Sequence, residues 1–225
     1  MGPQTRARYE IVEHEPLDPA SWSLVDALVD DPFYAAISVE QKEPAARRRG
    51  LAGYFSYSFE EPRLLGRCLH LDDRSIGSAA WLLPGNEERR RQASIRKCEF
   101  LERCLGSAGR RNYNAMVAWM SERSAPQLKN AWYLSIVGIA PHAQGRGLGR
   151  QLLLPTLHEA GKAGAVCYLE TFSSRSVRFY ERLGFCTLGV FLEPTTKSEY
   201  SLMVRYTSEP QEREKNDARC DPENI

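Results

Sequence analysis

A glycine-rich segment at residues 141–150 carries the most informative chemistry in the chain. It reads Pro-His-Ala-Gln-Gly-Arg-Gly-Leu-Gly-Arg and joins a predicted buried strand to a predicted helix. Backbone N–H groups at a helix start lack intrahelical partners and lie at the positive end of the helix dipole. Three glycines let an anion approach that backbone closely, and Arg146 and Arg150 add positive charge. The segment therefore predicts a cradle for a phosphate or diphosphate group.

Three interpretations of this segment fit the residues alone. The first is a tight strand-to-helix turn that binds no ligand. The second is a dinucleotide site, which Glu170 supports because it ends the next strand about 20 residues further on. Against it, Arg150 stands where the third glycine of G-x-G-x-x-G would fall, and the Gly-Lys-Ser/Thr of a P-loop is absent. The third is a loop for the diphosphate of coenzyme A, with Gln144, Gly147 and Gly149 in the sequence Gln-x-x-Gly-x-Gly.

Two motifs in order favour the third interpretation. Gln144-x-x-Gly147-x-Gly149 after a buried strand resembles a motif of the GNAT superfamily of N-acetyltransferases. About 30 residues downstream, Phe-Tyr-Glu-Arg-Leu-Gly-Phe at 179–185 resembles that superfamily's second motif. Residues 131–185 look especially similar to puromycin N-acetyltransferase-like enzymes, whereas the N-terminal half is only diffusely similar.

The resemblance implies direct transfer of an acetyl group from acetyl-CoA to the amine of a small molecule, with both held in a ternary complex. The backbone of Val137, Gly138 and Ile139 would pair with the pantetheine arm as an added strand. The glycine loop would hold the diphosphate. The residues expected to bind acetyl-CoA there are Gln144, Gly145, Arg146, Gly147, Leu148, Gly149 and Arg150.

Two side chains are candidates for proton transfer. Tyr180 would protonate the leaving thiolate, because a phenol with a pKa near ~10 is protonated at neutral pH. Its spacing from Val177 and Leu183 equally suits a core position on a helix. Glu170 would accept a proton from the amine, and a solvated or salt-bridged strand-end carboxylate is the alternative.

Aromatic and basic residues of the N-terminal half are weaker candidates. Tyr34 and Trp81 are candidates for walls of the substrate site, although a buried structural role is the more frequent one for an aromatic residue in such a position. The arginine runs at 47–49 and 89–91 suit solvated helix faces better than an acidic partner.

The predicted elements indicate an α/β domain, a mixed sheet flanked by helices, and the resemblance implies the GNAT acyl-CoA N-acyltransferase fold. Residues 1–206 are expected to form one domain and residues 207–225 a disordered charged tail. Strands are predicted at 8–13, 64–71, 75–83, 131–140, 165–171, 185–192 and 198–206. Helices are predicted from Asp18 to Asp31, at 44–59, at 87–124 as two helices broken at 106–109, at 148–162 and at 174–183.

The composition of the chain argues against several classes of protein. The chain has 225 residues and a formal net charge of +1, which argues against a nucleic-acid binder. No apolar run approaches a membrane span, and the four histidines lack metal-site spacing. With no export signal, the six cysteines are expected to be reduced in a cytoplasmic protein, a monomer or homodimer. A protein or peptide N-acetyltransferase and a non-catalytic acyl-CoA sensor remain as alternatives.

Overall fold

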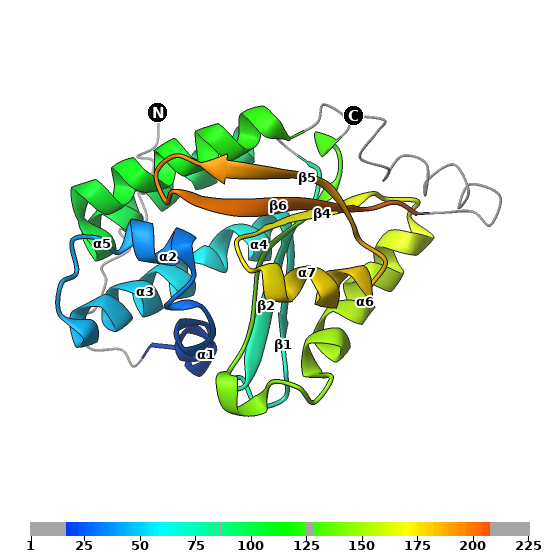
Figure 1. Ribbon diagram of the computed structural model, residues 1–225, viewed down its shortest axis with the longest axis horizontal. Coiled ribbons are helices and arrows are strands. Elements are labelled where there is room, and N and C mark those ends of the chain that lie inside the picture. Colours follow the sequence, from blue (N-terminus) through cyan, green and yellow to red (C-terminus); the bar gives the residue numbers. More distant parts are fainter. Residues whose placement is uncertain (1–16, 86, 125–127, 208–225) are drawn as a thin grey trace, which may run out of the picture.

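The computed structural model describes residues 17–85, 87–124 and 128–207, arranged around one mixed six-stranded sheet (Figure 1). The strand order is β1-β2-β3-β4-β6-β5, and only β3 and β4 are parallel neighbours. This confirms the predicted mixed α/β fold. The strands are β1 (Gly66–His70), β2 (Gly77–Leu82), β3 (Trp132–Ile139), β4 (Cys167–Thr171), β5 (Cys186–Glu193) and β6 (Ser198–Arg205).

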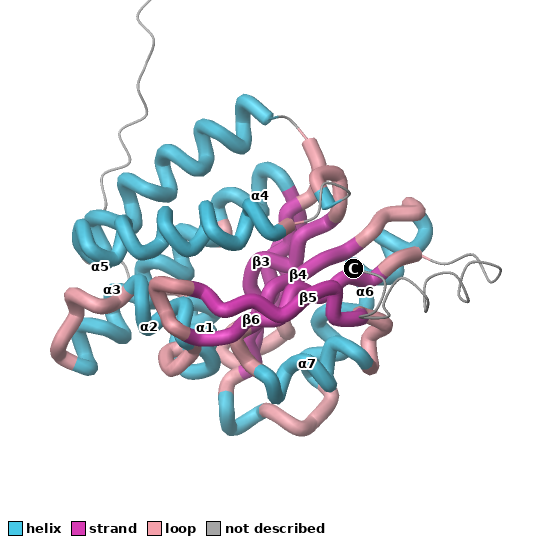
Figure 2. The backbone as a smooth tube through the Cα atoms, turned by 45° about the horizontal axis from the view of Figure 1, so that its top comes forward, coloured by secondary structure: helices cyan, strands magenta, loops and turns pink. Residues whose placement is uncertain are grey.

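Helices cover both faces of the sheet, as Figures 1 and 2 show. The first two begin at an aspartate followed by proline, and the carboxylates of Asp18 and Asp31 accept backbone N–H bonds in their first turns. The helices are α1 (Pro19–Leu28), α2 (Pro32–Ile37), α3 (Pro44–Ser58), α4 (Glu60–Leu65), α5 (Glu87–Arg123), α6 (Leu148–Lys162) and α7 (Ser174–Glu181).

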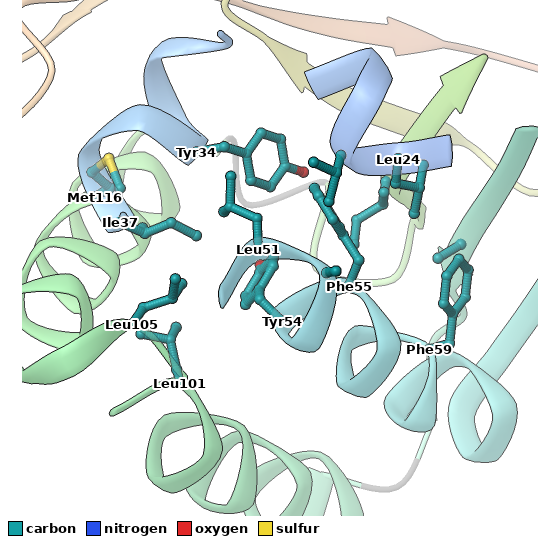
Figure 3. Close-up of a cluster of buried hydrophobic side chains, with 14 of the residues drawn as sticks. Leu24, Tyr34, Ile37, Leu51, Tyr54, Phe55, Phe59, Leu101, Leu105 and Met116 are labelled. Atoms are coloured by element: carbon teal, nitrogen blue, oxygen red, sulfur yellow. The ribbon is translucent and has the colours of Figure 1, made fainter. Parts of the chain in front are cut away.

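The core divides into two large clusters, one on each face. Along β2, Ala80 packs with the cluster of α1, α2, α3 and α5, whereas its neighbours Ala79 and Trp81 pack with α6 and α7. This alternation follows from the two-residue period of a strand. Figure 3 shows the first cluster, in which Tyr34 and Tyr54 lie among leucines. The two helical layers are therefore held by opposite faces of one sheet.

The parallel pair β3 and β4 separates almost at once, and this separation creates the site. Only Trp132 and Tyr133 pair with β4, through Cys167 and Tyr168. On its other edge β3 stays paired with β2 as far as Ile139, with a bulge that leaves Ser135 unmatched. In Figure 1, β1 and β2 run across the direction of β4, β6 and β5. The β4-facing edge of β3 is thus open beyond Tyr133.

Most predicted elements are present with boundaries shifted by one or two residues. The segment 87–124 does contain two helical parts, because Gly106 has a φ of 84° inside α5. Helix α6 spans 148–162 as predicted and contains Pro155. The short helices α2 and α4 were not predicted. The predicted strand at 8–13 and the tail beyond residue 207 lie outside the described residues.

The cysteines differ in part from expectation. Cys68, Cys98, Cys104 and Cys167 are free thiols. Cys186 is disulfide-bonded, so the expectation of six reduced cysteines is wrong for that residue.

Candidate active site

A cavity of about 350 Å³ opens where β3 and β4 separate. Its walls come from both helical layers: α2, α3 and α5 on one side, α7 on the other, with β3 and β4 between them. Hydroxyl groups dominate the lining. The tyrosines that line it are Tyr34, Tyr54, Tyr113, Tyr133, Tyr168 and Tyr180.

The glycine loop precedes α6 and lies at the solvent surface, since Gln144 to Gly147 are all exposed. Gly145 and Gly147 have φ values of 79° and 78°, and a Cβ on either would meet no atom within 4 Å. Glycine is therefore needed there for its left-handed conformation, not because of crowding. Gly147 is the N-cap of α6 and supplies no side-chain cap, which leaves the first N–H groups of the helix available.

Some of the neighbouring loop residues make structural contacts, and others are exposed to solvent. The amide of Gln144 donates to the Ile139 carbonyl over 2.9 Å, which ties the loop back to the end of β3. A Cβ on Gly149 would lie 3.1 Å from the Phe179 ring, so this glycine allows α6 to approach α7 closely. Leu148 is partly exposed, whereas Arg146 and Arg150 are exposed.

The three strand residues expected to face acetyl-CoA differ in their side chains. Val137 lines the cavity. At Gly138 a Cβ would lie 2.8 Å from Leu24 and 2.9 Å from Ala27, so the glycine makes room for α1. Ile139 is partly buried against the cluster on the α6 side. Their backbone on the β4 side has no strand partner among the described residues, because the β3–β4 pairing ends at Tyr133.

Tyr180 lies on α7, whose N-cap is Ser173. Its ring packs edge-on against Phe179 and Phe185, and the side chain also lines the cavity. It is thus both a core residue and a cavity residue. Burial, and to a smaller extent Asp31, raises the pKa of Tyr180, so the phenol stays protonated across the physiological range.

Glu170 is the penultimate residue of β4 and lines the same cavity. Burial raises the pKa of its carboxyl to about 7, against a hydrogen-bonding interaction with Tyr133 that lowers it. No ion pair found among the described residues involves Glu170, which removes the salt-bridged alternative. A carboxyl with a pKa near neutrality can accept a proton from an amine and release it again.

Tyr34 and Trp81, the two aromatic candidates for the substrate site, lie in different places. Tyr34 lines the cavity and is 8% exposed. Trp81 is fully buried among Leu134, Leu153 and other residues on the α6 side, and it does not line the cavity. The expectation that Trp81 forms a substrate wall is therefore not supported, because the alternation along β2 directs its ring to the opposite face.

Three further cavity residues were not singled out from the sequence. Asp31 caps α2 and lines the cavity, where burial raises its pKa to about 6. Asp31-Pro32 marks the end of the first predicted helix, so neither the capping role of Asp31 nor its burial is predicted from the sequence. Lys97 and Glu61 form a pair 3.8 Å apart, and nothing in an arginine-rich helical segment distinguishes Lys97 from its charged neighbours.

The arginine runs contact the protein's own chain. Arg47 donates to the Val29 carbonyl and to Ser38, and Arg48 pairs with Asp26. In the described part of the chain, no cluster of three potential metal ligands occurs. Nor does that part contain a helix with the length and apolar character needed to cross a membrane.

Residues 78–185 match the family model of the acetyltransferase (GNAT) family. A crystal structure from Corynebacterium glutamicum, described as histone acetyltransferase HPA2 and related acetyltransferase, aligns with a TM-score of 0.59 and 25% identity over 85% of this chain and 91% of that one. Arylalkylamine N-acetyltransferase 2 from Aedes aegypti shares the fold, with a TM-score of 0.52 and 15% identity over 84% of this chain and 94% of that one. Just under half of the chain is thus similar to the GNAT family, and the fold is that of GNAT acetyltransferase structures.

Curated relatives match over a short segment. Mycothiol acetyltransferase of Nocardia farcinica is 49% identical over 58 residues, which are 24% of this chain and 19% of the relative. The enzyme of the same name from Mycobacteroides abscessus is 47% identical over 53 residues, or 22% of this chain and 18% of the relative. The chain thus spans about a fifth of these relatives. They are mycothiol acetyltransferases and not puromycin N-acetyltransferases, so the narrower resemblance is corrected.

Proposed function

We propose that this protein is an N-acetyltransferase that moves the acetyl group of acetyl-CoA directly to the amine of a small molecule. The observation that carries the proposal is the convergence of Tyr180 and Glu170 on one cavity, at the point where β3 and β4 separate. Residues 1–206 would act as a single domain.

The glycine loop and the open edge of β3 have the features that acetyl-CoA requires. The uncapped start of α6, with Arg146 and Arg150 beside it, suits a diphosphate. The unpaired backbone of β3 beyond Tyr133 suits an extended chain of amide groups. When bound, acetyl-CoA supplies an activated acetyl group as a thioester.

Glu170 would take the proton that the amine must lose. An amine with a pKa near ~10.4 is mostly protonated at neutral pH, so a base beside it lowers the barrier. Because burial raises the pKa of Glu170 to about 7, its carboxylate is a stronger base than an exposed one and is still ionised above neutrality.

Tyr180 would donate its hydroxyl proton toward the leaving sulfur. Its raised pKa keeps the donor protonated before transfer, and it regains any proton it gives up from solvent. A thiol has a pKa of roughly 8.5, so the hydrogen bond stabilises the charge on sulfur more than it drives complete proton transfer.

Release of the coenzyme A thiol tests the proposal. Mixing the protein with acetyl-CoA and a panel of small amines should liberate thiol in an amine-dependent way, with an acetylated amine detected by mass spectrometry. Turnover with peptides alone would favour a peptide acetyltransferase. Binding of acetyl-CoA without turnover of any amine or peptide would indicate a sensor. Thermal stabilisation by NAD and not by coenzyme A would reject the proposed donor.

A further inference from the structure

One end of the cavity contains a buried charged pair that acetyl transfer does not use. Lys97 of α5 lines the cavity and is 9% exposed, and its Nζ lies 3.8 Å from Oε2 of Glu61 on α4. Among the described residues that line the cavity, Lys97 is the one basic side chain. Burial of a cation costs desolvation free energy, which an anionic ligand can offset.

Its surroundings keep this amine charged. The Nζ atom lies 5.8 Å from the ring centre of Tyr54 and 5.5 Å from that of Tyr113. Burial alone would lower the pKa of Lys97, but the interactions with Tyr113, Tyr54 and Glu61 outweigh it and raise that pKa above the ordinary lysine value. The ammonium therefore persists throughout the pH range in which an acetyltransferase would work.

The ammonium retains capacity to bind. An ammonium has three N–H donors, and the 3.8 Å separation from Glu61 exceeds the length of a direct hydrogen bond. A hydrogen-bonding interaction with Tyr113 engages one donor. The carboxylate of Glu61 lowers the positive electrostatic potential at Lys97 but is too far away to accept a direct hydrogen bond from it. A strong acceptor on the cavity side can therefore still bind Lys97.

A row of tyrosines separates Lys97 from the proposed reaction centre. Tyr34 interacts electrostatically with Tyr180 at one end. The ring centres of Tyr34 and Tyr54 are 6.1 Å apart, and those of Tyr54 and Tyr113 are 6.4 Å apart. A molecule with its amine near Tyr180 would reach Lys97 only with its opposite end.

We propose that the acceptor is an amine that carries an anionic group, a carboxylate or a phosphate, at its far end, and that Lys97 binds this group. Lys97 is then a specificity-determining residue for the acceptor. Glu61 acts in the opposite sense, because its carboxylate competes with the anion for the same ammonium. This inference rests on the proposed acetyl transfer, which places the amine beside Tyr180.

A ladder of ω-amino carboxylates with increasing chain length, paired with the matching ω-amino amides, tests the proposal. Thiol release gives kcat/KM for each pair. We expect the carboxylate to exceed its amide by roughly tenfold to hundredfold at one optimal length, as for a hydrogen bond to a charged group. Lys97→Met should abolish that ratio, because only the carboxylates lose a hydrogen-bond partner. Glu61→Gln should increase it. Amines ending in phosphate distinguish the two anions.

The opposite effects expected for Lys97→Met and Glu61→Gln distinguish acceptor recognition from a purely structural role of the Lys97–Glu61 pair. If the pair only anchors α4 to α5, both variants lower thermal stability and neither changes the carboxylate-to-amide ratio, and the proposal is overturned. Lys129→Met removes a lysine of an exposed pair with Glu87 and should leave the ratio unchanged. Equal rates for carboxylates and amides in the wild type also reject it.

Calorimetry separates this proposal from the proposed function. If no amine is turned over, titration of the full chain with the same carboxylate and amide pairs still measures the preference. Tighter binding of the carboxylate that Lys97→Met removes would keep the anion site and reject only the acetyl transfer. Equal binding of both members would reject the anion site.

Discussion

The donor side and the acceptor side of the cavity are built in different ways. On the donor side, β3, the glycine loop, α6, β4 and α7 follow one another within residues 132–181. On the acceptor side, Tyr34, Tyr54 and Lys97 come from α2, α3 and α5, and α4, β1 and β2 intervene between α3 and α5. Contiguous sequence can fix a donor site through short motifs, whereas an acceptor site of this kind depends on how distant helices pack.

The comparisons follow the same division. The match to the GNAT family model covers residues 78–185, which include the whole donor side, and the curated relatives share only 53 to 58 residues with the chain. Helices α1 to α4 lie outside that family match. Inference about the acceptor must therefore come from the cavity itself.

The largest expected effect is on the donor side. Tyr180→Phe should lower kcat by about 10²–10⁴ while acetyl-CoA binding changes little, because it removes the proposed acid and keeps the ring packing. Tyr200→Phe is a matched control, since the buried Tyr200 hydroxyl has no hydrogen-bond partner among the described residues and Tyr200 does not line the cavity. Steady-state rates and calorimetry measure the two quantities. An unchanged kcat for Tyr180→Phe would remove the acid role.

Glu170→Gln tests the residue that lies between the two sides. The wild-type kcat/KM should fall on the acidic side of about pH 7, where Glu170 becomes protonated. The variant should be slower by roughly 10²-fold above neutrality, as expected for loss of a general base. Its acidic limb should also shift. A pH–rate profile for both proteins decides this, and identical acidic limbs would assign the limb to another group.

The same substitution should stabilise the fold at high pH. The pKa of Glu170 is raised from 4.5 to about 7, so the folded state binds more protons than the unfolded state between these values. Stability is thus lost as pH rises through the folded pKa, and a neutral glutamine avoids the loss. Glu170→Gln should gain on the order of 1–3 kcal/mol at pH 8 and nothing near pH 4. Urea unfolding at both pH values measures it.

Gly147→Ala tests the loop with a smaller effect. An alanine forced to a φ of 78° carries strain of about 1–2 kcal/mol, although its Cβ would meet no neighbour. Relaxation of the loop should raise the Kd for acetyl-CoA by roughly tenfold. Gly161→Ala in the same helix also enters open space and has no positive φ, so it should stabilise the protein by about 0.5–1 kcal/mol and leave the Kd unchanged. Calorimetry that shows equal Kd values for the two variants would contradict the cradle.

Much of the fold could be predicted because its elements carry local signals. Pro141 ends the apolar run that forms β3, and Gly184, with a φ of 86°, follows α7. The short helix α2 is not evident from the sequence, because Asp31-Pro32, which caps its start, equally marks the end of the helix before it. α4 was missed because α3 runs into it at Phe59 without a glycine or proline between them.

The candidate site could be predicted from the sequence only in part. The motifs located Tyr180 and Glu170, which both line the cavity. They could not reveal that β3 and β4 pair at only two residues, because where two strands separate depends on tertiary packing as well as on their own sequences. Lys97 and Asp31 were beyond reach for a related reason, since a charged residue is predicted to be exposed unless its partners are known.

The smallest expected effect on activity is at Trp81, and it separates packing from recognition. Trp81→Phe should lower the free energy of unfolding by about 1–3 kcal/mol through lost core volume. It should leave the acceptor KM unchanged, because Trp81 does not line the cavity and its indole Nε1 has no hydrogen-bond partner in the part of the chain that the structure describes. Tyr34→Phe should do the reverse, with a several-fold change in acceptor KM, since Tyr34 lines the cavity and the substitution removes a polar group from it. Thermal unfolding and acceptor kinetics on both variants measure this contrast. If Trp81→Phe alters acceptor KM as much as Tyr34→Phe does, then the core on the α6 side shapes acceptor recognition and the two sides of the site are not independent.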